Sequence, residues 1–470
     1  MDAPRPSPHW TPDEFRRHGH EVVEWVARYL ETLEERPVTS DVEPGWVRAQ
    51  LPASPPEQAE DFGAVLADLD RVITPALTHW QHPGWFAYFP TGASGPSVLA
   101  DLVASGLGVQ GMLWSTSPAA TELETHVLDW MAELLGLPDR FRSDGAGGGV
   151  IQDSASSATL CALIAARWRA AGDGPFDRLR VYASGQAHSS VEKAVRVAGL
   201  RPDQLRLIDV DDAHAAHPEH LAALMAEDAA AGLVPAFVVA NLGTTSSTAV
   251  DPIGAMAEVA AEHGAWLHVD GAHAGAHLVL PELRWIADGI ERADSFCMNP
   301  HKRLLVNFDC DCFWVADRQP LVAALSVLPE YLRNAATESG AVIDYRDWQI
   351  PLGRRFRALK LWFVLRAYGV EGLRAHVREQ TELAQQLAAR IAEHPRLELA
   401  APHPLDLVCF RHVDGDEASE ALLARLNETG RVFLTHTRLD DRFVLRVSVG
   451  AQATEARHVD ALWALIDELA

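Results

Sequence analysis

Residues 266–302 read WLHVDGAHAGAHLVLPELRWIADGIERADSFCMNPHK, and this stretch decides the fold. It contains two short apolar runs, 266–269 and 295–298, and a further run, 236–240, precedes them. Segments with helical periodicity separate the runs. Short buried strands joined by helical crossovers form a parallel sheet with helices on both faces. The sequence therefore predicts an α/β fold whose sheet lies between about residues 150 and 315.

The N-terminal region differs in character from the sheet region. Thr11, Pro12 and Glu14 form a capping box at the start of a long amphipathic helix. The apolar face of such a helix needs a cover, which a partner subunit could supply. Residues 37–60 are rich in Pro, Glu and Ala and are typical of a linker.

Two further patterns lie on either side of the predicted sheet. A second capping box at residues 121–124 predicts a helix that ends at Gly136. Towards the C-terminus, apolar runs at 407–410 and 443–447 are typical of strands in a smaller α+β domain.

The composition narrows the class of protein. With 40 Lys and Arg against 65 Asp and Glu, the formal net charge is −25. A surface this acidic repels phosphate backbones and anionic lipid headgroups, so we expect no nucleic-acid or membrane partner. The length of 470 residues indicates a globular protein of two or three structural units.

The five cysteines do not form the pattern of a disulfide framework. Cys310 and Cys312 have no second His or Cys pair at zinc-finger spacing, so no metal site is expected. The chain does not open with an apolar signal sequence, and it contains no apolar run of about 18 residues that could span a membrane. We therefore expect a reduced, soluble, cytoplasmic protein.

Lys302 follows the apolar run at 295–298, in the sequence Asn-Pro-His-Lys. Ligands of open α/β folds bind outside the carboxyl ends of the strands. A partly neutral lysine amine at that edge can form a Schiff base with an aldehyde cofactor. Taken alone, a solvated surface lysine is the more common interpretation.

Asp270 ends the apolar run at 266–269 and therefore points to the same edge of the sheet. A carboxylate there can pair with the protonated pyridine nitrogen of pyridoxal phosphate (PLP) and keep the ring an electron sink. A turn-capping aspartate is an equally good interpretation of this residue alone.

Three more segments place polar groups at strand ends. Glycines followed by small hydroxyl residues at 147–159 open a helix, whose free N–H groups and dipole favour a phosphate. His188 follows the run at 180–183 and could stack on a flat ring or act as an acid. Residues 242–245 supply a threonine hydroxyl. Each signal is weak by itself, but together they lie in the chain order of a PLP enzyme.

With these motifs in place, the chain resembles the group II PLP-dependent decarboxylases, and among them the aromatic-L-amino-acid decarboxylases. The resemblance extends from about residue 9 to 470. It rests on long contiguous motifs at 82–91, 117–124, 148–152, 186–192, 268–270, 299–302, 305–309 and 348–357.

The resemblance implies the PLP-dependent transferase fold of type I, assembled as a homodimer. Residues 1–90 would form a helical arm that packs across the dimer. Residues 91–365 would form the large PLP-binding domain with a mostly parallel, seven-stranded sheet, and 366–470 the small C-terminal α+β domain.

The resemblance also implies roles for individual residues. Lys302 would carry the cofactor, Asp270 would pair with its pyridine nitrogen, and His188 would stack on its ring. Tyr331 would donate a proton to the substrate carbon. Further cofactor contacts would come from Ala155, Ser156, Thr245 and Asn299, and substrate contacts from Trp80, Tyr88, Phe89, Thr91, His188 and Gly353.

Five residues depart from the family's pattern. Arg303 stands where a tryptophan usually follows the lysine, Asp153 replaces a glycine before the phosphate turn, and His273 replaces tyrosine or methionine. Gln110 and Met112 occupy positions beside the substrate that are usually more apolar or aromatic. The departures are compatible with the cofactor chemistry and bear on which substrate is bound.

The expected function is PLP-dependent decarboxylation of an L-amino acid to its amine and carbon dioxide. An apolar wall and the room left at Gly353 favour tryptophan, tyrosine or dihydroxyphenylalanine, whereas Gln110 could bond a polar side chain of a non-aromatic substrate. An aromatic aldehyde synthase is an alternative, although such enzymes typically carry phenylalanine in place of Tyr331. An inactive binding protein that has kept the fold is the alternative outside enzymes.

Overall fold

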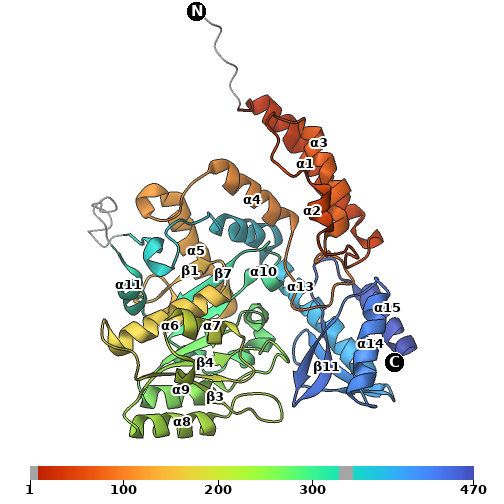
Figure 1. The fold of residues 1–470 in the computed structure, drawn as a ribbon. Coiled ribbons are helices and arrows are strands. Elements are labelled where there is room, and N and C mark those ends of the chain that lie inside the picture. Colours follow the sequence, from red (N-terminus) through yellow and green to blue (C-terminus); the bar gives the residue numbers. More distant parts are fainter. Residues whose placement is uncertain (1–8, 328–341) are drawn as a thin grey trace, which may run out of the picture.

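The structure is a computed structural model that describes residues 9–327 and 342–470. Figure 1 shows a helical arm that projects from the body, a large sheet flanked by helices, and a smaller unit that contains the C-terminus. Within the described ranges, no helix combines the length and the apolar character needed to cross a membrane.

The large sheet has seven strands in the spatial order β1-β7-β6-β5-β4-β2-β3. Neighbours from β6 to β3 pair in parallel, and β7 is antiparallel to both β1 and β6. The predicted seven-stranded, mostly parallel sheet is therefore confirmed. The strands are β1 (Gly148–Gln152), β2 (Leu179–Ser184), β3 (Leu205–Ile208), β4 (Val234–Asn241), β5 (Trp266–Asp270), β6 (Ser295–Met298) and β7 (Asp311–Val315).

Helices cover both faces of this sheet, as its apolar strands require. One core packs β1, β2 and β4 against α6 (Ala155–Ala171), α7 (Ser190–Val197) and α11 (Gln319–Leu325). The other face is covered by α5 (Pro118–Leu135), α8 (Pro218–Ala230), α9 (Ile253–Glu262) and the start of α13 (Ala358–Glu393). These helices cover the faces of the sheet, and the loops that carry polar residues lie at the carboxyl ends of its strands.

The smaller unit is built on an antiparallel sheet in the order β10-β11-β9-β8. α13 leads into this unit and is kinked at Gly369, whose φ of 66° lies in the left-handed region that favours glycine. The strands are β8 (Leu397–Leu399), β9 (Leu407–His412), β10 (Thr435–Leu439) and β11 (Arg442–Ser448), and α14 (Asp416–Glu428) and α15 (Ala456–Leu469) pack on them.

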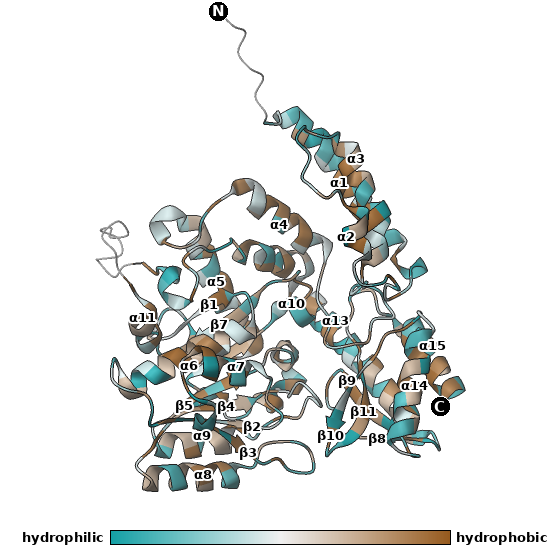
Figure 2. Cartoon of the chain, in the orientation of Figure 1, coloured by the Kyte–Doolittle hydropathy of each residue, from teal (hydrophilic) through white to brown (hydrophobic). Residues whose placement is uncertain are grey.

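The arm consists of α1 (Pro12–Glu31), α2 (Trp46–Gln50) and α3 (Phe62–Asp68), with α2 inside the expected linker. The predicted capping box is present, because Thr11 Oγ1 accepts from the Glu14 amide while the Glu14 carboxylate accepts from the Thr11 amide. No residue of α1 is buried. Figure 2 shows hydrophobic positions along the arm. Among the described residues of α1, the side chains of Phe15, Val22, Val23 and Leu30 are exposed.

The predicted start of the helix after residue 120 is wrong. α5 begins at Pro118, where the Ser117 hydroxyl caps it by accepting from the Ala120 amide. The predicted end is right, since Gly136 has a φ of 71°. Glu124 does not serve a cap; its buried carboxylate accepts from the Ile151 amide at 2.8 Å and from Arg354 at 2.6 Å.

Candidate active site

A cavity of about 230 Å³ lies at the carboxyl edge of the large sheet. Strand β6 ends at Met298, and the short helix α10 (Pro300–Arg303) follows, so that Lys302 is presented at this edge. The cavity is lined by eight predicted site residues, Phe89, Ala155, Ser156, His188, Thr245, Asp270, Asn299 and Lys302, and also by Ser154, Ser190, Asn241, Gly243, Ala272, His273, His301 and Phe308.

The amine of Lys302 is buried beside an aromatic ring. Its Nζ lies 5.2 Å from the centre of the Phe89 ring. Burial lowers the pKa of Lys302 below the usual lysine value, and the negative charge of Asp270 opposes this only in part. A larger fraction of the amine is therefore neutral than in a solvated lysine, and the neutral form is the nucleophile.

Asp270 is the last residue of β5, and only 7% of its surface is exposed. Its Oδ1 accepts a hydrogen bond from the Ala272 amide at 3.0 Å, which fixes the carboxylate at the strand end. Asp270 also lines the cavity, so its carboxylate can pair with a cationic group there.

His188 lies at the end of the loop after β2. Its Nδ1 accepts from the Ser190 amide at 3.1 Å and lies 2.8 Å from the Ser190 hydroxyl. An Nδ1 that accepts from an amide carries no proton, so the neutral ring has its proton on Nε2. Burial lowers the pKa of His188, which favours this neutral form.

The start of α6 provides an anion site. Ser154 caps the helix by accepting from the Ser157 amide, and the amides of Ala155 and Ser156 lie in the first turn, where no helical acceptor exists. Free N–H groups and the helix dipole together favour a phosphate at this point.

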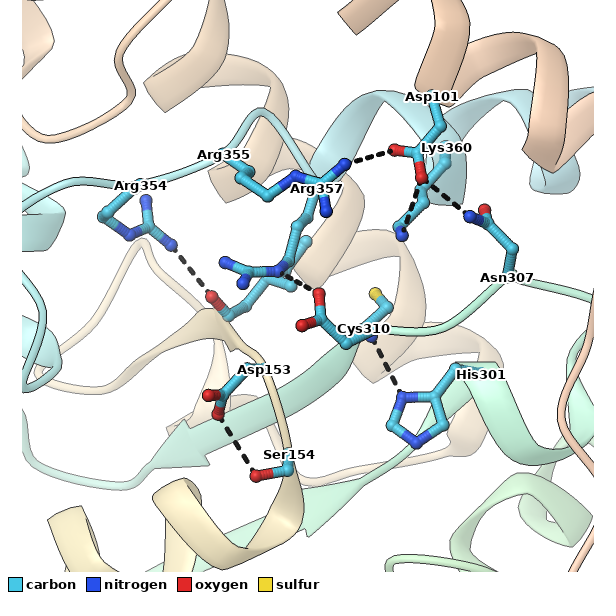
Figure 3. A network of polar contacts seen from close by, with 12 residues as sticks. Asp101, Asp153, Ser154, His301, Asn307, Cys310, Arg354, Arg355, Arg357 and Lys360 are labelled. Atoms are coloured by element: carbon cyan, nitrogen blue, oxygen red, sulfur yellow. Dashed lines mark hydrogen bonds and ion pairs between the residues drawn. The ribbon is translucent and has the colours of Figure 1, made fainter. Parts of the chain in front are cut away.

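The unexpected Asp153 directly precedes this anion site and contacts Ser154 (Figure 3). Its negative charge is balanced in part by Arg357. Burial works against the Arg357 charge, but a hydrogen bond to Asp309 at 2.8 Å and the carboxylates of Asp309 and Asp153 raise the pKa of the guanidinium. The departure at Asp153 therefore does not leave an isolated carboxylate beside the phosphate turn.

Polar contacts also hold the segment that follows Lys302 (Figure 3). His301 Nδ1 accepts from the Cys310 amide at 3.0 Å, which closes the loop between α10 and β7. Asn307 donates to Asp101 of α4 (Gly95–Leu107) at 2.7 Å, and Lys360 of α13 lies 3.4 Å from the same carboxylate. These contacts fix the loop between two helices.

Four predicted substrate residues lie away from the cavity. Trp80 and Tyr88 stack on each other at 5.6 Å with 36% and 51% of their surfaces exposed. Thr91 accepts from Gln81. Gly353 lines a different hollow, together with Gln110. Tyr331 lies outside the described residues, and the roles of all five stay predictions.

The sequence did not single out Arg446, although it borders the cavity wall. Its guanidinium lies 5.3 Å from the Phe89 ring and donates to the carbonyl oxygens of Thr245 and Ser246 at 2.8 and 3.0 Å. It therefore braces two predicted site residues. An arginine in a strand of the smaller sheet carries no local pattern that points to this contact.

The residues of the cavity fit PLP. Asn299 Oδ1 is buried and makes no hydrogen bond within the described part of the chain, so it offers a polar group to a ligand. The start of α6 suits the phosphate, Asp270 the pyridine nitrogen and Lys302 the aldehyde carbon. Among the described residues no cluster of His, Cys, Asp or Glu could hold a metal ion.

Comparison with known proteins agrees with this fit. The pyridoxal-dependent decarboxylase conserved domain matches residues 44–413. The chain is 46% identical to phenylacetaldehyde synthase of Arabidopsis thaliana, over 97% of this chain and 96% of that protein. It is 44% identical to aromatic-L-amino-acid decarboxylase of Mus musculus, over 97% of each.

The fold matches that of a solved relative. The crystal structure of Oryza sativa TDC with PLP and tryptamine superposes with a TM-score of 0.96 at 41% identity, over 98% of each chain. The predicted family, cofactor and carboxy-lyase class are thereby confirmed. This chain belongs to the pyridoxal-dependent decarboxylase family.

Proposed function

We propose that this enzyme decarboxylates an aromatic L-amino acid, such as tryptophan, tyrosine or dihydroxyphenylalanine, to the corresponding amine. The observation that carries the proposal is the cavity itself, where Lys302, Asp270 and His188 converge beside the flat ring of Phe89. Full-length relatives named for aromatic amino acids support the substrate class.

The cofactor defines what the protein must provide. When bound, PLP supplies an electron sink for the electron pair left as carbon dioxide departs. Asp270, at the end of β5, would pair with the pyridine nitrogen, and the first turn of α6 would hold the phosphate. Such positioning contributes roughly 7–11 kcal/mol to lowering the barrier.

Lys302 and His188 complete the proposed arrangement. The lowered pKa of Lys302 keeps part of the amine neutral for covalent attachment and for release of the product. The neutral ring of His188 offers a flat, uncharged surface for stacking. Tyr331 is proposed to return a proton to the α-carbon.

A homodimer is part of the proposal. The exposed apolar side chains of α1 include Phe15, Val22, Val23 and Leu30. A second copy would cover this face by two-fold symmetry. We further propose an arm of residues 1–90, a cofactor domain of 91–365 and a small domain of 366–470, working in the cytoplasm, where the five unpaired, buried cysteines would stay reduced.

Oxidative conversion of the aromatic amino acid to an aldehyde is the second candidate. It is favoured by the 46% identity to a phenylacetaldehyde synthase and opposed by the tyrosine at position 331. The two reactions differ in their stoichiometry, since only the aldehyde route consumes dioxygen and water and releases ammonia and hydrogen peroxide.

Purified enzyme loaded with PLP should be incubated with each of the twenty L-amino acids and with dihydroxyphenylalanine. We expect an aromatic amine and carbon dioxide in equal amounts, without ammonia or peroxide. An aldehyde with stoichiometric ammonia would favour the second candidate. Amine from a non-aromatic substrate alone would contradict the proposed substrate class.

A further inference from the structure

Two of the unexpected residues meet at one buried carboxylate. His273 Nε2 donates to Asp406, at 2.8 Å from Oδ1 and 3.1 Å from Oδ2, and Arg303 Nε lies 3.3 Å from Oδ2. His277 Nε2 lies 3.3 Å from Oδ1. All four side chains are at most 2% exposed. We call this group, His273, His277, Arg303 and Asp406, the Asp406 cluster.

The cluster contains the ion pair between Asp406 and Arg303. Burial favours the neutral acid, but the charge of Arg303 and the neighbouring histidines hold the pKa of Asp406 well below its usual value. Burial lowers the pKa of His273 to about 3, so its ring is neutral. Asp406 and Arg303 therefore carry the opposite charges, and His273 acts as a neutral donor.

The cluster joins the two sheets of the molecule. Asp406 directly precedes β9 of the smaller sheet. Arg303 is the last residue of α10 and also donates to the carbonyl oxygen of Val449, just after β11, at 2.9 Å. His273 lies in the turn after β5, and His277 lies in the short 3-10 helix Ala274–Val279 that follows it. One carboxylate thus ties the smaller sheet to two loops at the edge of the larger one.

Both of these loops carry predicted cofactor residues. Arg303 is adjacent to Lys302 in the same helical turn, and His273 follows three residues after Asp270. His273 also stacks on Phe89, with ring centres 3.7 Å apart and an interplanar angle of 20°. The same Phe89 ring lies 5.2 Å from Lys302 Nζ. Asp406 is therefore linked to the cavity by two sets of contacts. One passes through Arg303 to Lys302, and the other through His273 to Phe89.

Close packing leaves the guanidinium little freedom. A β-carbon at Gly450 would lie 1.6 Å from Arg303 Nη1, so only glycine leaves room there for the side chain. The Arg303 position is therefore set from both sides, by the carboxylate of Asp406 and by the backbone of residues 449–450.

We propose that Asp406 is a positioning residue for the cofactor site, which holds the Lys302 turn through Arg303 and the Phe89 ring through His273. It touches neither cofactor nor substrate. The inference rests on the proposed roles of Lys302 and Phe89. Loss of the Asp406 charge should loosen both loops at once and weaken PLP binding in protein that is still folded.

The test compares Asp406→Asn with Asp228→Asn, which removes a buried carboxylate that does not line the cavity. Asp228 is 1% exposed, pairs with Arg206 at 2.5 Å and accepts from Tyr182 at 2.7 Å beside the edge strand β3. The PLP dissociation constant, the visible circular dichroism of bound PLP and the melting temperature are measured for each full-length protein.

We expect Asp406→Asn to raise the PLP dissociation constant at least tenfold and to change the visible circular dichroism, which reports the orientation of the ring. Asp228→Asn should lower the melting temperature but keep the dissociation constant within twofold. A PLP affinity of Asp406→Asn within twofold of the wild type, or equal weakening in both variants, would overturn the proposal.

His273→Phe decides the matter if Asp406→Asn does not fold. It keeps an aromatic ring against Phe89 and removes only the donor to Asp406, so we expect a three- to tenfold weaker PLP affinity; unchanged affinity and spectrum would refute the inference. Wild-type protein and Lys302→Ala are measured alongside. If the wild type fails to bind PLP through Lys302, the proposed function fails instead.

Discussion

The cavity beside Lys302 and the N-terminal arm differ in how many of their contacts come from this chain. At the cavity, one chain brings together Lys302, Asp270, His188 and the start of α6, which are held by hydrogen bonds or close packing. On the arm, α1 has no buried residue, and side chains such as Phe15 stay 58% exposed.

The predicted cofactor and substrate residues also differ in placement, although two of the substrate set, Phe89 and His188, line the cavity. All described cofactor residues line one cavity, whereas Trp80, Tyr88, Thr91 and Gly353 lie outside it. On the proposed function, one chain supplies the cofactor contacts, and the proposed homodimer would complete the substrate side of the site.

The largest expected effect is at the attachment lysine. Lys302→Ala should lower the decarboxylation rate by roughly 1000-fold or more, because the covalent attachment of the cofactor is lost. The visible absorbance of lysine-bound PLP should disappear as well. Lys193→Ala, at an exposed position of α7, is the control and should keep both. If the Lys302→Ala protein kept the wild-type absorbance, the claim that Lys302 binds the cofactor would be contradicted.

A smaller loss is expected at the end of β5. Asp270→Asn keeps the hydrogen bond from Ala272 possible but removes the charge that faces the pyridine nitrogen. Turnover should fall by about 10²–10³-fold, the usual effect of removing one preorganised electrostatic contact. Steady-state rates at saturating PLP measure this, and a loss below threefold would show that Asp270 does not face the ring.

The arm provides the complementary test. Phe15→Asp combined with Val22→Asp places charges on the exposed apolar face of α1. If that face is a subunit interface, each substitution at an interface centre costs roughly 2 kcal/mol or more. We expect sedimentation to show a monomer whose turnover falls about tenfold or more.

PLP affinity should change less than threefold in the same protein, because the cavity lies within one chain. If the variant lost both cofactor binding and turnover, the cofactor site would not be independent of the second subunit. A wild-type protein that sediments as a monomer would also contradict the proposal.

The smallest effect is on stability. His268 of β5 is fully buried, and burial lowers its pKa to about 4, so the unfolded chain binds a proton that the folded chain does not. The stability that the neutral His268 contributes to the folded state is complete above the unfolded pKa of about 6.5. It is lost as the pH falls towards the folded pKa of about 4.

Urea unfolding of wild type and His268→Gln at pH 8 and pH 6 isolates this group. The stability difference between the two proteins should shrink by about 1 kcal/mol at the lower pH. His20→Gln, on the exposed arm, is the control. If the difference in unfolding free energy between wild type and His268→Gln were the same at pH 8 and pH 6, the core around β5 would have to admit water.

The sequence predicted the parts of the fold that have a strong local signal. The apolar runs became β4, β5 and β6, and the Thr11 capping box opens α1. The predicted start of α5 was three residues too late. The spacing of Thr121 and Glu124 matches a capping box in sequence, and sequence alone does not show that the Glu124 side chain is buried in the core. Glu124 turns inward because Arg354 and the Ile151 amide, both distant in sequence, bind it.

At the site, residues at strand ends were predictable and residues that act across elements were not. Lys302 and Asp270 follow apolar runs that meet at one sheet edge. Arg446 and Asp406 come from the smaller sheet, and no spacing rule relates them to Phe89 or His273. The expected substrate contacts of Trp80 and Gly353 were inferred from resemblance alone, and one chain does not bring them to the cavity.

The central claim is that Lys302 carries the cofactor in a cavity built by one chain. The chain has three lysines, and of the other two Lys193 is exposed while Lys360 is buried against Asp101. Borohydride reduction of the PLP-loaded enzyme, followed by digestion and mass spectrometry, locates the attached pyridoxyl group. We predict one label, on Lys302; a label on Lys193 or Lys360, or none at all, would contradict the account.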